Sequence, residues 1–197
     1  NVVNLRAEDL DGVYSFDLRN TLSGKSLKWG NYQAGVIHGL MEKGYHVRGM
    51  DLLFIGNIPF GSGLSSSAAI ELTTAVAAAT LSENFTEKGI DLVQMALIGQ
   101  TAEHTFCNVH CGIMDQFASA MGKKDHAILL DCASLKYKYV PLDLGNYMLV
   151  LANTCKKHAL GASAYNKRRE EVAEGLLRMN HALDENRVNL CDFNETD

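Results

Sequence analysis

The 197-residue sequence lacks the features of membrane-spanning, secreted and nucleic-acid-binding proteins. No apolar run approaches the roughly 18 residues that cross a bilayer, and the N-terminal stretch turns acidic too early for a signal peptide. Five cysteines, an odd number without framework spacing, favour a reduced, cytoplasmic protein. The net charge is −5, and acidic and basic residues are interspersed, so we expect neither a nucleic-acid nor a membrane partner.

The composition that remains is that of a globular protein. Hydrophobic residues make up 47% of the chain and charged residues 21%, which suffices for one or two domains with their own cores. The sequence starts at Asn1 rather than Met and ends abruptly in CDFNETD. We therefore expect this sequence to be a piece of a longer protein.

Hydrophobic periodicity and turn residues predict a mixed architecture. Strands are expected over 1–7, 12–18, 50–58, 126–131, 136–140 and 146–153, the last as a central strand. Helices are expected over 29–44, 65–81, 86–106 with Thr86 as the cap, 112–121 and 162–185. Strands and helices do not alternate strictly, so the predicted fold class is α+β.

A glycine-serine turn precedes the helix expected over 65–81. Gly61 and Gly63 allow positive φ and the close approach of an anion, and the first amides of a helix attract negative charge. Ser65, Ser66 and Ser67 add hydroxyl groups at the same place. A simple serine N-cap is the ordinary alternative, but two glycines and three serines together favour a phosphate cradle. The turn has neither the lysine of a Walker A loop nor the third glycine of a dinucleotide-binding loop.

Two acidic residues are candidates for the chemistry that a phosphate cradle would serve. Asp115 is expected in the first turn of a helix and has small neighbours that leave room for a ligand. It could equally be a charge that favours the helix dipole. Glu103 is expected near the C-terminal end of a helix, where a carboxylate opposes the dipole unless a cation meets it. A solvated glutamate is the commoner explanation for Glu103.

Four potential metal ligands lie close together in the sequence, namely His104, Cys107, His110 and Cys111. Zinc sites usually pair two close ligands with a second pair well downstream. No such second pair follows, so we do not predict a zinc site.

Four segments resemble the galactokinases of the GHMP kinase superfamily, in the order in which that family has them. They are 28–40 (KWGNYQAGVIHGL), 59–68 (PFGSGLSSSA), 111–119 (CGIMDQFAS) and 151–171 (LANTCKKHALGASAYNKRREE). The resemblance implies a GHMP-kinase fold with a ribosomal protein S5 domain 2-like N-terminal domain. Residues 1–146 would be the remainder of that domain, and residues 147–197 the start of the C-terminal α+β domain.

The resemblance also implies an activity, the ATP-dependent phosphorylation of galactose at its anomeric hydroxyl. Asp115 would be the catalytic base, and Ser67 and Glu103 would bind Mg²⁺, with Ser66 as the less favoured hydroxyl ligand. The sugar would contact Gly112, Asp115 and Tyr165, although Tyr165 by itself would pass for an ordinary helix residue. The ATP-binding residues would be Gly61, Ser62, Gly63, Leu64, Ser65, Ser66 and Ser67. We expect a monomer.

Two family motifs are missing from the sequence: the N-terminal sugar-binding signature and the C-terminal glycine-rich motif. Residues 4–11 (NLRAEDLD) match that signature only in part and fit a strand-turn-strand better. We therefore expect the 197 residues alone to be inactive. The sugar preference of the protein stays open. An N-acetylgalactosamine kinase, a non-catalytic sugar sensor and a core without ligand binding are the alternatives. The intact run Ser65–Ser67 argues against the sensor.

Overall fold

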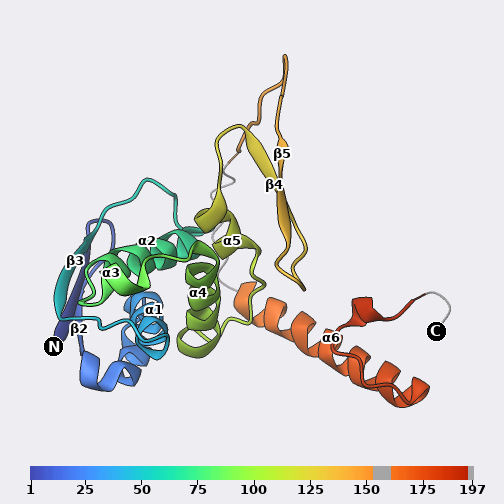
Figure 1. Cartoon of the computed structure of the whole chain (residues 1–197), viewed down its shortest axis with the longest axis horizontal. Helices are drawn as coiled ribbons and strands as arrows, with labels where there is room; N and C mark the ends of the chain where they lie inside the picture. The colour runs from blue at the N-terminus through green and yellow to red at the C-terminus, as the bar shows by residue number, and fades with distance from the viewer. Residues whose placement is uncertain (153–160, 195–197) are drawn as a thin grey trace.

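The computed structural model describes residues 1–152 and 161–194. A three-stranded sheet lies at one side of the molecule, in the order β2-β1-β3 (Figure 1). Strand β1 (Val2–Ala7) pairs antiparallel with β2 (Val13–Asp17) and parallel with β3 (Met50–Phe54). Residues 4–11 therefore run from β1 into the turn before β2, as the strand-turn-strand prediction requires.

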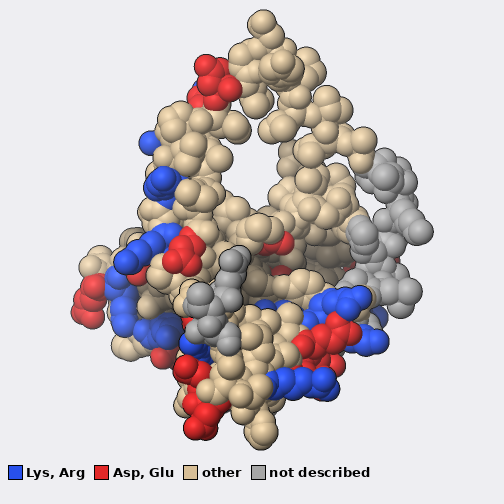
Figure 2. Space-filling model, turned by 90° about the vertical axis from the view of Figure 1, so that its right-hand side faces the viewer, with Lys and Arg blue, Asp and Glu red and all other residues tan. Residues whose placement is uncertain are grey.

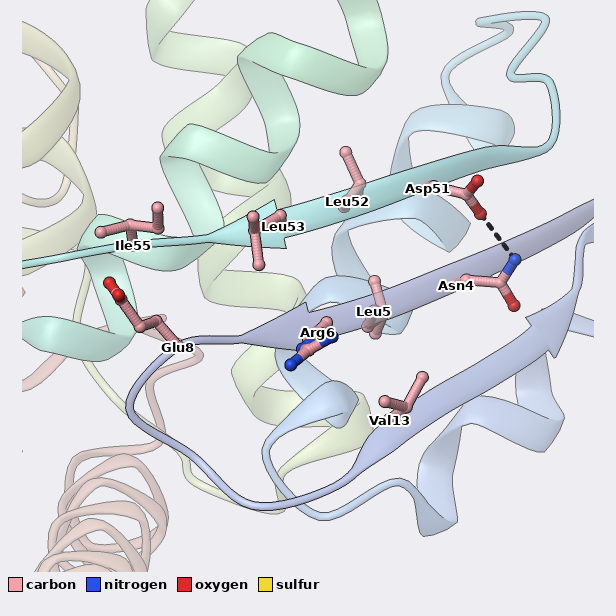
Figure 3. A pocket seen from close by; sticks show the side chains of 9 residues that line it. All are labelled: Asn4, Leu5, Arg6, Glu8, Val13, Asp51, Leu52, Leu53 and Ile55. Carbon is pink, nitrogen blue, oxygen red and sulfur yellow. Dashed lines mark hydrogen bonds between the residues drawn. The ribbon is translucent and has the colours of Figure 1, made fainter.

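The two faces of the sheet differ because successive side chains of a strand point to opposite sides. Val3 and Leu5 are fully buried against the helices. On the other face, Asn4 donates a hydrogen bond of 2.6 Å from Nδ2 to Oδ1 of Asp51, and Arg6 lies beside them (Figure 3). This face carries a shallow pocket of about 560 Å³. None of the predicted site residues lines it.

Helices α1 (Gly30–Glu42), α2 (Ser66–Thr80) and α4 (Leu92–Phe106) cover the buried face of the sheet (Figure 1). Helices α1 and α4 approach closely, since a Cβ on Gly35 would lie 2.7 Å from the Cβ of Ala102. The main core is apolar and includes Val3, Leu5, Phe16, Val36, Ile37, Leu40, Leu72, Met95, Ile98 and Phe106. This packing fixes the ends of α2 and α4 relative to each other.

The second half of the chain is more extended (Figure 1). Helix α5 (Met114–Met121) packs against α4 and buries Phe117. The hairpin of β4 (His126–Leu130) and β5 (Tyr137–Pro141) follows α5. Helix α6 (Gly161–Leu183) starts near α4 and α5 and leads away from them. Three short helices complete the described part: η1 (Leu18–Ser26), α3 (Phe85–Lys88) and η2 (Leu190–Asp192).

The single helix predicted over 86–106, with Thr86 as its cap, is wrong. The structure has α3 up to Lys88, a break at Gly89 with φ +61°, and then α4 from Leu92. Asp91 is the N-cap of α4, since its Oδ1 accepts from the amides of Val93 and Gln94 at 3.0 and 3.2 Å. The local cap and the glycine outweighed the continuous helical pattern.

The central strand predicted over 146–153 is also wrong for residues 146–152, and residue 153 lies outside the described residues. The apolar side chains from Tyr147 to Leu151 are all at least 75% exposed. A strand needs a neighbour to pair its backbone groups, and the described part of the chain provides none here. The domain boundary placed between residues 146 and 147 stays a prediction.

Charged side chains of both signs are mixed over the face seen in Figure 2. On α6, Arg168 pairs with Glu171, and Arg178 pairs with Glu174.

Within the described residues, no helix has both the length and the apolar character that a membrane span requires.

Candidate active site

Most of the predicted site residues line one pocket of about 570 Å³. Its wall is formed by the loop before α2, the C-terminal end of α4, the start of α5 and the start of α6. The predicted residues in this wall are Gly61, Gly63, Ser65, Ser66, Ser67, Glu103, Gly112, Asp115 and Tyr165. Segments that are about 100 residues apart in the sequence therefore meet at one place.

The glycine-serine loop takes the left-handed backbone that its glycines predict. Gly61 and Gly63 have φ of +67° and +78°, and Ser65 has φ +56°. Ser65 is the N-cap residue of α2, but its side chain makes no capping bond. No hydrogen bond of the Ser65, Ser66 or Ser67 hydroxyls occurs within the described residues. The ordinary capping explanation is therefore wrong, and the hydroxyls and first amides of α2 are available to an anion.

Two predicted loop residues do not line the pocket, Ser62 and Leu64. The Ser62 hydroxyl donates a hydrogen bond of 2.7 Å to the carbonyl oxygen of Pro59 and so stabilises the turn. The Leu64 side chain is 41% exposed. Their assignment to the nucleotide stays a prediction.

Asp115 lies half-buried in the first turn of α5, as the sequence predicts. The N-cap of this helix, Ile113, supplies no side-chain hydrogen bond, and the Asp115 carboxylate lies at the positive end of the helix dipole. Gly112 precedes the helix and is exposed. Asp115 therefore faces a pocket with room for a ligand.

Glu103 is buried, with 6% of its surface exposed, so the solvated explanation is wrong. Its neighbours are two buried residues that the sequence reasoning missed, Glu71 of α2 and Gln116 of α5. The Gln116 amide Nε2 donates to Oε2 of Glu71 at 3.0 Å and to Oε1 of Glu103 at 3.4 Å. The sequence did contain one indication that Glu71 is buried, because it is the only charged residue between 65 and 81.

Burial raises the pKa of Glu71 from its ordinary value of 4.5 to about 10, and the nearby charge of Glu103 adds to the shift. Gly99 of α4 makes this burial possible, because a Cβ there would lie 3.0 Å from Oε2 of Glu71. Oε1 of Glu71 and Oε1 of Gln116 have no partner among the described residues. Glu71 is therefore a protonated, neutral acid at neutral pH, and it is hydrogen-bonded to Gln116, which lines the pocket.

We expect the Glu71→Gln variant to lose a pH dependence of stability. Between pH 4.5 and about 10, folded Glu71 holds a proton that the unfolded chain has released, so the stability it contributes declines as the pH rises. As the pH rises, the free energy of unfolding of the wild type should fall more steeply than that of the variant, by up to about 1.4 kcal/mol per pH unit. Urea denaturation from about pH 5.5 to 8.5 measures this, and parallel profiles would contradict a buried neutral Glu71.

Burial also raises the pKa of the Cys107 and Cys111 thiols to about 12, so both are protonated at neutral pH. His104 Nε2 contacts the carbonyl oxygen of Cys111 at 2.8 Å. Within the described residues, no group of three or more His, Cys, Asp or Glu side chains is arranged to hold a metal. An ion in the pocket would rely on Glu103, a serine hydroxyl and ligand oxygens, a set that suits Mg²⁺.

Tyr165 reaches the pocket from the start of α6. Its hydroxyl oxygen accepts a hydrogen bond of 3.1 Å from the backbone amide of Gly112. Two of the three residues assigned to the sugar, Gly112 and Tyr165, thus lie side by side, although 53 positions separate them in the sequence.

Comparison with known proteins agrees with this geometry. Residues 31–123 match the family described as "GHMP kinases N terminal domain". Nearly half of the chain is thus similar to the N-terminal domain of GHMP kinases. The α+β fold and the GHMP-kinase architecture predicted from the sequence are confirmed.

The GHMP kinase relatives with curated names include galactokinases. The Clostridium tetani galactokinase is 46% identical over 98% of this chain and 48% of its own length. The Bacillus subtilis galactokinase is 43% identical over 88% of this chain and 44% of its own length. A crystal structure of Lactococcus lactis galactokinase complexed with galactose has a TM-score of 0.86 and 37% identity, and covers 98% of this chain and 49% of that protein. The chain thus spans about half the length of the curated relatives it matches.

Proposed function

We propose that the full-length protein is a galactokinase, which transfers the γ-phosphoryl group of ATP to the anomeric hydroxyl of galactose. The observation that carries the proposal is the meeting of the glycine-serine loop, Glu103, Asp115 and Tyr165 in one pocket. The similarity to galactokinases over 98% of the chain supports the choice of sugar.

The glycine-serine loop would hold the phosphates of ATP. Its left-handed glycines keep the backbone free of Cβ atoms, and no atom of the described residues lies within 4 Å of where a Cβ of Gly61 or Gly63 would be. The first amides of α2 and the hydroxyls of Ser65, Ser66 and Ser67 would donate to phosphate oxygens. Such a fixed set of donors stabilises the charge of the transferring group.

Glu103 and Ser67 would hold Mg²⁺. The fit is supported by a buried carboxylate at the pocket wall and by a serine hydroxyl that has no hydrogen-bond partner among the described residues. When bound, the ion neutralises phosphate charge. Gln116 would keep the Glu103 carboxylate in place, through its bond to Oε1 of Glu103.

Asp115 would accept the proton of the sugar hydroxyl as that oxygen attacks phosphorus. Asp115 is half-buried in the first turn of α5 and lines the pocket, so its carboxylate oxygens face the space that the sugar would occupy. Gly112 and Tyr165 would contact the sugar beside Asp115. The reaction thus needs only orientation, charge stabilisation and one proton acceptor from the protein.

The direct test is an assay of the full-length protein with Mg²⁺, ATP and either galactose or N-acetylgalactosamine. We expect phosphorylation of galactose at the anomeric position and a kcat/KM for N-acetylgalactosamine that is at least about tenfold lower, a difference of about 1.4 kcal/mol. Preference for N-acetylgalactosamine would correct the substrate. ATP binding without turnover of either sugar would indicate a sensor instead.

A further inference from the structure

The start of helix α6 lies near α4 and α5, and the rest of the helix leads away from them (Figure 1). Within the described residues, three hydrogen bonds join it to the loop between α4 and α5, which precedes Asp115. One is the bond from the Gly112 amide to Tyr165. The other two belong to the neighbouring residue, Asn166, to which the sequence reasoning gave only a place on a solvated helix face.

Asn166 is half-buried, and its side-chain amide binds two backbone groups of the loop. Its Nδ2 donates to the carbonyl oxygen of Asn108 at 2.9 Å, and its Oδ1 accepts from the amide of His110 at 3.0 Å. We call this pair of bonds the Asn166 clamp. A primary amide has a donor and an acceptor at the same end, so Ala, Asp or Ser cannot reproduce it.

The clamped loop leads directly to the proposed catalytic residues. On its other side, the loop is bonded to α4, where the Val109 amide donates to the carbonyl oxygen of Glu103 at 3.1 Å. Asn108 has φ +55°, a left-handed conformation that asparagine adopts more readily than most residues and that turns the chain after α4. The clamp therefore holds a turn whose two ends lead to Glu103 and Asp115.

We propose that Asn166 is a positioning residue, which fixes Asp115 and Tyr165 relative to each other by clamping the α4–α5 loop to α6. The inference rests on the proposed sugar kinase activity of this site. Asn166 itself does not line the pocket. Its effect on the reaction passes through the loop, since misplacing a reacting group by about 1 Å can lower a rate by about 100-fold.

The helix also offers a matched control. Near its other end, Asn180 makes the same two bonds with a backbone segment: Nδ2 donates to the carbonyl oxygen of Arg187 and Oδ1 accepts from the Arg187 amide, both at 2.9 Å. Asn180→Ala thus removes an equivalent clamp from the same helix, far from the site.

The test compares full-length wild type, Asn166→Ala, Asn166→Asp and Asn180→Ala. We expect Asn166→Ala to lower kcat/KM for galactose by about 10- to 100-fold, with the KM for ATP within about twofold because the glycine-serine loop is untouched. Asn166→Asp keeps the acceptor for the His110 amide, so its kcat/KM for galactose should lie between those of the wild type and Asn166→Ala. Asn180→Ala should stay within about twofold of wild type. Hydrogen exchange of the His110 amide should be faster in Asn166→Ala and unchanged in Asn180→Ala.

Each outcome decides one point. Faster His110 exchange with unchanged kinetics in Asn166→Ala would overturn the positioning role, and unchanged exchange would overturn the clamp itself. If thermal denaturation shows that Asn166→Ala does not fold, the kinetics of Asn166→Asp, which loses only the hydrogen bond to Asn108, decide the positioning role. A wild type that phosphorylates no sugar would refute the proposed function, while His110 exchange would still test the clamp.

Discussion

Asp115→Asn in the full-length protein should lower kcat by about 10²- to 10⁴-fold, the usual contribution of a general base. Asn has nearly the same shape as Asp, but its amide cannot take up the proton of the attacking hydroxyl. Asp115 lies in the first turn of α5 and in the pocket wall, and the glycine-serine loop belongs to another element. The affinity for ATP should therefore stay within about twofold.

The control for this prediction is Asp125→Asn. Asp125 is exposed and has a left-handed φ of +58°, which Asn tolerates well, so this variant should keep wild-type turnover. Steady-state kinetics give kcat, and calorimetric titration of ATP gives its affinity. Turnover of Asp115→Asn within about threefold of wild type would contradict the assignment of the base.

Glu103→Gln should have the second-largest effect, a fall in kcat of roughly 10²- to 10³-fold, as when a group aimed at developing charge is removed. The fall should come with a higher Mg²⁺ concentration for half-maximal activity, because a neutral amide oxygen is a weaker ligand than a carboxylate. The substitution keeps the packing of a side chain that is only 6% exposed.

A Mg²⁺ titration separates a metal ligand from a purely structural glutamate. A structural role would lower stability without changing the dependence on Mg²⁺, and that result would contradict the metal assignment. Glu87→Gln is the matched control, since Glu87 is exposed on α3 and should affect neither readout.

Prediction from the sequence succeeded where the signal was local. The strands at 1–7 and 12–18 and the helix beginning at Ser66 follow from side-chain periodicity and turn residues. The glycine-serine loop was readable for the same reason, because positive φ and free helix amides depend on adjacent residues. Prediction failed at residues 86–106, where Asp91 and Gly89 start a new helix, and at 146–152, where no partner strand is present in the described part.

The sequence by itself determined the α+β fold, and it predicted a phosphate-binding loop and two acidic residues suited to phosphoryl transfer. Only the tertiary structure decided that Glu103 is buried beside a protonated Glu71, and that Asn166 clamps the loop before Asp115. The physical reason is distance along the chain. Gln116 meets Glu71 across 45 positions, and Asn166 meets His110 across 56. Such contacts depend on how helices pack, and no local pattern of residues encodes them.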